Sequence, residues 1–307
     1  MLMISEHCLI HRLFQSSIMK NRRLIIKTLI IDCHAICHAA KHTMGDLSYE
    51  EQKVGIIFGF MKQMLSLSKA FDTNQFIFAW DSKRSKRRDI YPEYKNRKPR
   101  PQEEIEFEKF AFKQFIELRT KTLQKFGFKN SFIQTGLEAD DIIAAITKNY
   151  KQEFVIISGD GDLYQLLDTH VDMYSPKKKG KAYTLNQFKA EYGITPEQWV
   201  TVKQVAGCRS DTVAGIVGVG EKRAIQYIKG TLKHKTKGYQ NIIVGKDIIK
   251  RNEILVKLPF PGTKIPVLKK DGPFYLANFY ELTDKYGFRS MQQINQMEEW
   301  ERQFGMI

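Results

Sequence analysis

The sequence predicts an α/β fold in which a central, mostly parallel sheet is flanked by helices. Short apolar runs rich in β-branched residues alternate with longer segments of helical periodicity along the first two thirds of the chain. Acidic residues lie at the ends of three of these runs. Because the carboxyl ends of parallel strands meet at one edge of a sheet, the predicted fold brings these carboxylates together.

The first half of the alternation consists of two apolar runs, each followed by a helical pattern. Residues 28–31 (TLII) and 75–80 (QFIFAW) have the length and the β-branched or aromatic content of buried strands. Residues 50–69 carry apolar side chains at helical spacing, and residues 103–126 form a longer helical pattern that Gly127 ends. Strands separated by helices of this length favour parallel pairing.

The second half repeats the pattern and then changes. A short strand is expected at residues 131–134, a helix at 138–149 and a strand at 153–158 (EFVIIS). We therefore expect an N-terminal extension at residues 1–27, an α/β core at residues 28–182 and a mainly helical C-terminal region at residues 183–307.

The overall charge indicates a polyanionic partner. The chain has 307 residues, with 49 Lys and Arg against 34 Asp and Glu, a formal net charge of +15 and a pI near 9.5. Such a balance is typical of nucleic-acid-binding proteins, although many basic proteins bind no nucleic acid. The four cysteines show no disulfide framework, which favours a reducing cytoplasm. No apolar run reaches the ~18 residues that a membrane span needs.

Eight acidic residues occur in a few short clusters, most of them at strand ends. A single such residue could cap the following helix, complement its dipole or shape a turn. The joint pattern favours a metal site, because so many buried carboxylates would repel each other without cations between them. Hard, oxygen-preferring ions such as Mg²⁺ suit these ligands. The candidate ligands are Asp32, Asp81, Glu138, Asp140, Asp141, Asp160, Asp162 and Asp211.

A basic segment at residues 82–101 (SKRSKRRDIYPEYKNRKPRP) directly follows Asp81. A charge run is usually a solvated surface. Here Tyr91 and Tyr94 alternate with cations, which could neutralise phosphates while the rings stack on bases. We interpret the segment as a guide for a nucleic-acid strand beside the metal site. Its candidate contact residues are Arg87, Arg88, Tyr94, Lys95 and Arg97.

A glycine-rich turn, GVGEKRA at residues 218–224, precedes an expected helix. Gly218 and Gly220 allow the backbone to approach a phosphate closely, and the helix N-terminus supplies N–H donors. Lys222 and Arg223 add positive charge. Such turns are common, but the position of this one shortly after Asp211 favours a second contact with nucleic acid.

Four sequence elements, taken together and in this order, resemble the 5′-nuclease family. That family includes flap endonucleases, the 5′-nuclease domain of bacterial DNA polymerase I and phage 5′→3′ exonucleases. The elements are WDSKRSKRRDIYPEYKNR, EADDIIA, ISGDGDLYQL and SD-x-x-x-G-x-x-G-V-G, within roughly residues 28–230. The likeness is greatest to the ribonuclease H of T-even phages, which removes RNA primers. It implies a PIN-like fold with a helical arch formed by the basic segment.

The resemblance also implies roles for the matching positions. Two Mg²⁺ ions would be bound, and Mn²⁺ could substitute for them. Residues 203–228 would form a helix–three-turn–helix element that binds duplex backbone, with a K⁺ held by loop carbonyls. Lys95 and Arg87 would contact the scissile phosphate, and Tyr94 would stack near unpaired nucleotides. The first ion would be held by Asp32, Asp81, Glu138 and Asp140, and the second by Asp141, Asp160, Asp162 and Asp211.

The activity implied by the resemblance is that of a structure-specific 5′→3′ exonuclease and flap endonuclease in DNA replication. Its substrates would be DNA and RNA–DNA hybrids with 5′ ends or flaps. The enzyme would be a cytoplasmic monomer, in the bacterial host if a phage encodes it. A single-strand-binding protein or a polymerase would be its partner.

One departure from the family pattern keeps two alternatives open. The family usually reads G-D-x-x-D-N-x-P-G where this chain reads GCRSDTVAG, so Cys208 replaces one acid of the second metal site. This loss favours an inactive, structure-specific DNA-binding protein as one alternative. A PIN-type ribonuclease, which shares a related acidic site, is the other.

Overall fold

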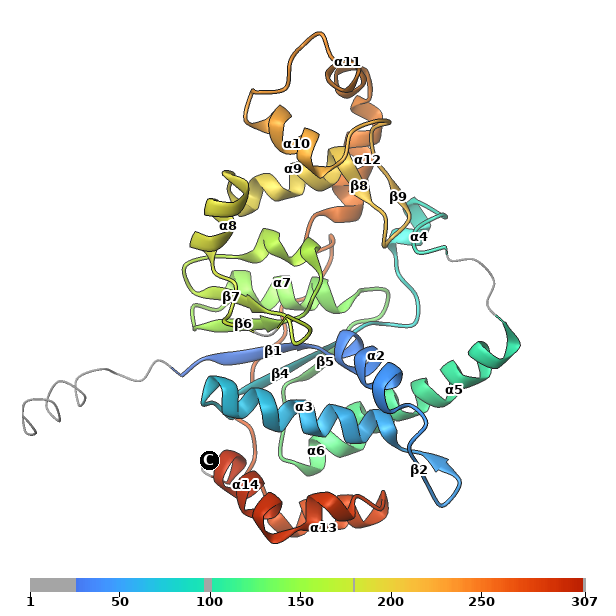
Figure 1. The fold of residues 1–307 in the computed structure, drawn as a ribbon, viewed down its shortest axis with the longest axis vertical. Helices are drawn as coiled ribbons and strands as arrows, with labels where there is room; N and C mark the ends of the chain where they lie inside the picture. The colour runs from blue at the N-terminus through green and yellow to red at the C-terminus, as the bar shows by residue number, and fades with distance from the viewer. Residues whose placement is uncertain (1–25, 97–100, 179, 306–307) are drawn as a thin grey trace, which may run out of the picture.

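The computed structural model describes residues 26–96, 101–178 and 180–305 of the chain. Its centre is a five-stranded sheet with the order β5-β4-β1-β6-β7, in which every pairing is parallel (Figure 1). The predicted fold class is therefore confirmed, and β7 is a strand that the sequence pattern did not predict. The strands are β1 (Thr28–Asp32), β4 (Phe76–Trp80), β5 (Ser131–Ile133), β6 (Phe154–Ile157) and β7 (Val171–Tyr174).

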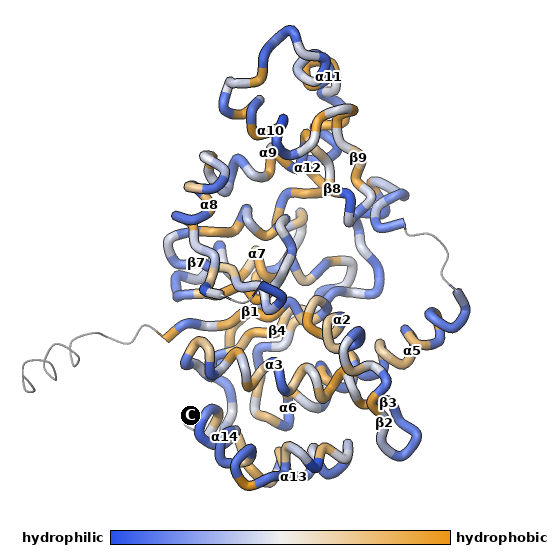
Figure 2. The backbone as a smooth tube through the Cα atoms, in the orientation of Figure 1, coloured by the Kyte–Doolittle hydropathy of each residue, from blue (hydrophilic) through white to orange (hydrophobic). Residues whose placement is uncertain are grey.

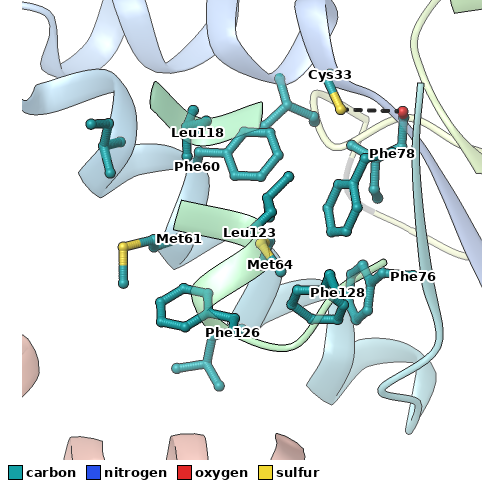
Figure 3. Packing of buried hydrophobic residues seen from close by; sticks show 14 of the residues in the cluster. Cys33, Phe60, Met61, Met64, Phe76, Phe78, Leu118, Leu123, Phe126 and Phe128 are labelled. Carbon is teal, nitrogen blue, oxygen red and sulfur yellow. Dashed lines mark hydrogen bonds between the residues drawn. The ribbon is translucent and has the colours of Figure 1, made fainter. Parts of the chain in front are cut away.

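Both faces of the sheet are buried, because side chains alternate along each strand. Leu29 and Ile31 of β1 point into one hydrophobic cluster, whereas Ile30 points into a second cluster on the opposite face. The first cluster is rich in aromatic rings and contains Phe60 and Phe126 (Figure 3). Apolar residues accordingly follow the strands and the inner faces of the helices, while connecting loops are mostly hydrophilic (Figure 2).

Helices cover the two faces of the sheet. The first cluster lies under α2, α3 and α5, and the second lies under α7. The long helix predicted at residues 103–126 is present, with a single π-helical turn in it (Leu118–Thr122). The elements of this part are α2 (Cys33–Met44), the hairpin β2 (Ser48–Tyr49) and β3 (Gln52–Lys53), α3 (Gly55–Phe71), α4 (Arg87–Ile90), α5 (Gln102–Glu117), α6 (Leu123–Lys125), α7 (Ala139–Asn149) and a 3₁₀ turn (Gly161–Leu166).

The region predicted as one C-terminal unit at residues 183–307 divides into two parts at opposite ends of the molecule (Figure 1). One part contains α8 (Leu185–Tyr192), α9 (Pro196–Ala206), β8 (Gly207–Cys208), β9 (Val213–Ala214), α10 (Glu221–Ile228), α11 (Lys237–Val244) and α12 (Lys246–Val256). The other part contains α13 (Leu276–Lys285), a 3₁₀ turn (Arg289–Gln292) and α14 (Ile294–Phe304). This second part packs into the first cluster through Phe279, Trp300 and Phe304, so it belongs to the α/β core. None of the described helices has the length and apolarity that a membrane crossing requires.

Candidate metal centre

The acidic residues predicted at the strand ends line one cavity. Asp32 is the last residue of β1, Asp81 follows β4, and Asp160 lies shortly after β6. Together with Glu138 and Asp140 at the start of α7, they border a cavity of about 980 Å³. The carboxyl ends of neighbouring parallel strands therefore bring together residues far apart in the sequence, as such sheets commonly do.

Hydrogen bonds from nearby groups hold these carboxylates in place. Asp32 caps α2 through the amide of Ala35 at 3.1 Å and accepts a second hydrogen bond from the Ser158 hydroxyl at 2.9 Å. Asp81 accepts a hydrogen bond from the amide of Ala139 at 2.7 Å. The side chains are therefore oriented by rigid elements rather than by flexible loops.

Three of these carboxylates, Asp32, Asp140 and Asp160, are poorly neutralised. Burial, followed by repulsion from Asp81, raises the pKa of Asp32 to about 7. Burial, followed by repulsion from Asp160, raises the pKa of Asp140 well above its ordinary value. Burial and the nearby Asp162 carboxylate raise the pKa of Asp160. A divalent cation would relieve both the repulsion and the desolvation, so this oxygen-rich group fits Mg²⁺ or Mn²⁺.

A second group of candidate ligands lies beside the first and is partly neutralised by the chain itself. The ligand atoms of Asp162, Cys208 and Asp211 all lie within 4.8 Å of one another. The Lys203 ammonium is 2.9 Å from Asp162, and the Lys95 ammonium is 3.6 Å from Asp211. Burial, followed by the nearby Asp162 carboxylate, raises the pKa of Cys208 to about 12, so its thiol stays protonated at neutral pH and donates to Asp162.

Two backbone features position this second group. The β8–β9 hairpin begins at Gly207, where a Cβ would lie 2.4 Å from the amide nitrogen of Gly215, so no larger residue fits there. Lys95 has a positive φ of 51°, and its amide donates a hydrogen bond to the carbonyl of Asp211 at 2.8 Å. The turn after α4 and the hairpin are thereby joined directly beside the acids.

Arg87 and Asp141 do not face the cavity, contrary to the prediction for both. Their side chains are 2% and 0% exposed and form a two-pronged ion pair at 2.7 and 2.8 Å. The Asp141 carboxylate also accepts hydrogen bonds from the amides of Glu138 and Phe260. All strong acceptor positions of Asp141 are therefore used inside the protein, and Arg87 is too buried to reach a phosphate.

The remaining residues of the basic segment have mixed positions. Tyr94 is 1% exposed and its hydroxyl lies 2.9 Å from Glu138, so it is not available for stacking on a nucleotide as predicted. Arg88 is exposed, and its guanidinium donates to the carbonyls of Tyr94 and Lys95. Arg97 lies outside the described residues. Only Lys95, among the described residues predicted to contact the scissile phosphate or stack on nucleotides, lines the cavity.

The glycine-rich turn forms the N-terminus of α10. Along the chain, α9 precedes the β8–β9 hairpin and α10 follows it. Lys222 and Arg223 are exposed in the first turn of α10. Gly218 has a φ of +76°, and nothing lies within 4 Å of a Cβ built on Gly220. The turn therefore presents open backbone and positive charge to solvent.

Three residues of the site were not predicted from the sequence. Ser158 donates to Asp32, and Lys203 bridges Asp162 and Glu221. His34 Nδ1 accepts the amide hydrogen of Asp81 at 3.1 Å, which requires an unprotonated Nδ1. Only His34 had a local signal, because it lies two residues after Asp32 at a strand end.

The comparisons with known proteins agree with this geometry. The profile of the family described as "5'-3' exonuclease, N-terminal resolvase-like domain" matches residues 27–193, more than half of the chain. The chain belongs to the 5′–3′ exonuclease family. Its members among curated proteins include a DNA polymerase I of Thermus thermophilus, 28% identical over 224 residues that cover 70% of this chain and 26% of the polymerase. DNA polymerase I of Streptococcus pneumoniae is 29% identical over 261 residues, which cover 77% of this chain and 28% of the polymerase. This exonuclease-family chain thus spans about a quarter of the length of those relatives.

Solved structures show the same fold. The bacteriophage T5 D15 protein, co-crystallised with metal ions, has a TM-score of 0.66 and 25% identity and covers 76% of this chain and 90% of its own. A T5 5′-exonuclease structure with divalent zinc ions bound has a TM-score of 0.65 and 26% identity. The flap endonuclease-1 of Methanococcus jannaschii shares the fold at 14% identity, with a TM-score of 0.55 and coverage of 90% and 92%. The T5 members of this family thus bind metal ions.

Proposed function

We propose that this protein is a structure-specific 5′→3′ exonuclease and flap endonuclease that hydrolyses phosphodiesters in DNA and in RNA–DNA hybrids. The observation that carries the proposal is the cavity lined by Asp32, Asp81, Asp140 and Asp160, whose charges are poorly compensated by the protein. Such a cavity needs cations, and a nucleic acid supplies the phosphates that such cations bind.

Two Mg²⁺ ions, or Mn²⁺ in their place, are the cofactors that we propose. Asp32, Asp81, Asp140 and Asp160 would hold one ion, with Glu138 beside it. When bound, the ions would supply Lewis-acid activation of water and neutralisation of charge on the phosphate. The second position would use Asp162 and Asp211, with Cys208 in place of a carboxylate and Lys203 nearby. We therefore expect weaker binding at the second position.

Lys95 is the residue that we assign to the scissile phosphate. Its ammonium lies 3.0 Å from Glu138 and 3.6 Å from Asp211, and it borders the cavity. These carboxylates raise the pKa of Lys95 more than burial lowers it, so the ammonium stays charged at neutral pH. A charged donor held at the cavity wall can stabilise the charge that develops on a phosphoryl oxygen.

Duplex DNA would lie across the N-terminus of α10, where Lys222 and Arg223 are exposed. The open backbone of Gly218 and Gly220 and the helix dipole suit a phosphate. A K⁺ ion at this loop would share the carbonyl oxygen of Gly218 with the Arg223 guanidinium, which donates a hydrogen bond to it. Arg88 would extend the contact on the other side of the site, and we keep Arg97 as a proposed DNA contact from its place in the basic segment.

The biological setting that we propose is removal of RNA primers during DNA replication, in a cytoplasmic enzyme that acts as a monomer. A single-strand-binding protein or a polymerase would direct it to its substrates. An inactive DNA-binding protein is the second candidate, and the ion pair between Lys203 and Asp162 favours it. A PIN-type ribonuclease is the third, but the basic turn at α10 fits duplex better than unstructured RNA.

Cleavage of 5′-labelled substrates tests these functions against one another. A 5′-flap DNA, a nicked duplex, an RNA–DNA primer hybrid and an unstructured RNA would be incubated with Mg²⁺, with Mn²⁺ and with EDTA. We expect metal-dependent cleavage of the flap and the hybrid at their 5′ ends. Binding without cleavage would establish the inactive protein, and cleavage of the unstructured RNA alone would establish the PIN-type ribonuclease.

A further inference from the structure

An extended segment joins the two C-terminal parts around the edge of the sheet. We call residues 258–275, between α12 and α13, the strap; in Figure 1 it passes behind the sheet. It lies beside β5, the edge strand, without pairing to it as a strand. Side chains, together with one backbone hydrogen bond from Gly272 to Gly127, hold it there instead.

Two amide side chains bind the strap in the manner of a neighbouring strand. The Gln134 side chain accepts from the amide of Lys264 at 2.9 Å and donates to its carbonyl at 2.7 Å. The Asn130 side chain does the same with Lys269, at 2.8 and 2.7 Å. Between them, the Tyr150 hydroxyl donates to the carbonyl of Pro266.

The other side of the strap is unpaired. In an extended chain, successive residues direct their N–H and C=O groups to opposite sides. Lys264 and Pro266 form hydrogen bonds toward the protein, so the N–H and C=O groups of Ile265 and Val267 point outward. Within the described residues, neither of these two residues forms a backbone hydrogen bond. Their side chains are also 51% and 71% exposed, and Ile133 of β5 is 41% exposed. A strand from another chain can pair with an exposed edge that carries β-branched side chains.

The charge around this edge is positive. A pocket of about 400 Å³ opens at the end of the strap and is lined by Lys125, Lys129, Lys269 and Tyr275, among others, with no acidic residue in its lining. Lys125 pairs with Glu281, whereas Lys129 and Lys269 have no ion-pair partner among the described residues. The one acid of the strap, Asp271, accepts hydrogen bonds from the amide of Lys129 and the side chain of Asn130, and it offsets part of the charge of the Lys129 ammonium.

We propose that the strap is a docking edge for an acidic, extended peptide of a partner protein, which adds to the backbone of Ile265 and Val267. Apolar side chains of the peptide would cover Ile265 and Val267, and a carboxylate would enter the pocket between Lys129 and Lys269. A nucleic acid fits less well, because the edge presents exposed β-branched side chains and backbone carbonyls beside its amides, and carbonyl oxygens repel phosphate whereas a peptide strand pairs with both groups. The pocket includes Ser131, at the start of β5, whereas the acidic cavity lies at the strand ends, so docking leaves the metal centre free.

The test uses the full chain and three fluorescein-labelled probes in fluorescence anisotropy. One is a twelve-residue peptide in which Asp or Glu alternates with Ile or Phe. The second has Lys in place of the acids, and the third is a twelve-nucleotide single-stranded DNA. We expect the acidic peptide to bind with a dissociation constant on the order of 10 μM and the Lys peptide not to bind. The single-stranded DNA should bind at the nuclease site and should not compete with the acidic peptide. N-methylation of alternate residues of that peptide, which removes donors without touching the protein, should abolish binding.

Variants and hydrogen exchange locate the contact. Lys129→Glu combined with Lys269→Glu should weaken peptide binding about tenfold or more, whereas Lys189→Glu, an exposed lysine on α8, should not. The amides of Ile265 and Val267 should exchange fast in the free protein and slowly with peptide bound. Peptide binding that survives the double variant, or exchange that stays fast, overturns the proposal. Equal loss of DNA binding in the double variant would identify a nucleic-acid surface instead.

Discussion

The two halves of the acidic site differ in how their charges are compensated. On one side, the buried Asp32 and the half-buried Asp140 and Asp160 lie near one another, and desolvation together with mutual repulsion raises their pKa values. On the other side, Asp162 and Asp211 lie 2.9 and 3.6 Å from lysine ammonium groups. The first half can become ionised at low cost only with an external cation, whereas the second half carries part of its own countercharge, even though burial still raises the pKa of Asp211 to about 6.

The largest effect is expected from the half that depends on external cations. Asp160→Ala removes a carboxylate from the cavity and should slow cleavage of a 5′-flap DNA about a thousandfold or more, or about 4 kcal/mol. Single-turnover kinetics with Mg²⁺ measure this loss, and anisotropy in Ca²⁺ should show nearly unchanged DNA binding. Asp247→Ala, an exposed acid on α12, is the matched control. A rate within threefold of the wild type for Asp160→Ala would contradict the metal assignment.

Arg87 should matter for stability and not for chemistry. Arg87→Met leaves the Asp141 carboxylate buried without its partner, so the free energy of unfolding should fall by about 3 kcal/mol. Urea unfolding measures this free energy. Arg88→Met, which changes the exposed neighbouring arginine, is the control. The double variant Arg87→Met/Asp141→Leu should recover most of the loss. If Arg87→Met unfolds like the wild type but cleaves slowly, the guanidinium contacts substrate after all.

Lys95 connects the two halves, and its loss should affect catalysis more than binding. Lys95→Met should slow the single-turnover rate about a hundredfold, the range typical of one lost transition-state donor. DNA binding should weaken only a few fold, because many other cations remain. Lys83→Met, an exposed lysine of the same segment, provides the comparison. A single-turnover rate equal to that of the control removes Lys95 from the mechanism.

Without metal, the first half should make stability depend on pH. Since the pKa of Asp32 is about 7 in the folded chain and 3.8 ordinarily, the folded state binds the proton more tightly than the unfolded state. The stabilisation that protonated Asp32 gives the folded state is therefore present at low pH and is lost as the pH rises from about 4 through 7. In EDTA the free energy of unfolding should be about 2 kcal/mol higher at pH 5 than at pH 8. This difference is smaller than the full pKa shift of Asp32 implies, because the cavity is open to water. Mg²⁺ should restore stability at pH 8. Asp32→Asn in EDTA should reduce the pH dependence, and the remainder comes from Asp140, Asp160 and Asp211, whose pKa values are also raised.

The smallest effect is expected where the chain supplies its own countercharge. Lys203→Met removes the ammonium beside Asp162, so an ion at the second position should bind about threefold more tightly. Titration with Mn²⁺, followed by the electron paramagnetic resonance signal of the free ion, measures this without substrate. Glu221→Gln, which removes the other partner of Lys203, should change the affinity less. Unchanged or weaker Mn²⁺ binding in Lys203→Met would show that the lysine does not oppose the ion.

Strand-end position was sufficient to predict that Asp32, Asp81 and Asp160 meet, because the geometry of a parallel sheet requires it. The partners of individual charges were not predictable in the same way. Arg87 lies among several exposed cations, and nothing in its neighbours indicates that it turns inward to Asp141, 54 residues away. Tyr94 was misassigned for the same reason, since its burial depends on the hairpin that carries Asp211.

The aromatic contacts of the last helix set a lower limit on the length of an independently folding fragment. Trp300 packs against Phe126, and Phe304 against Phe76 and Phe128, all within the cluster below the sheet. A fragment cut at residue 193, where the family match ends, would leave those rings open to water. Expression of residues 27–193 alone should therefore yield aggregated protein, even though that region contains all the carboxylates that line the cavity.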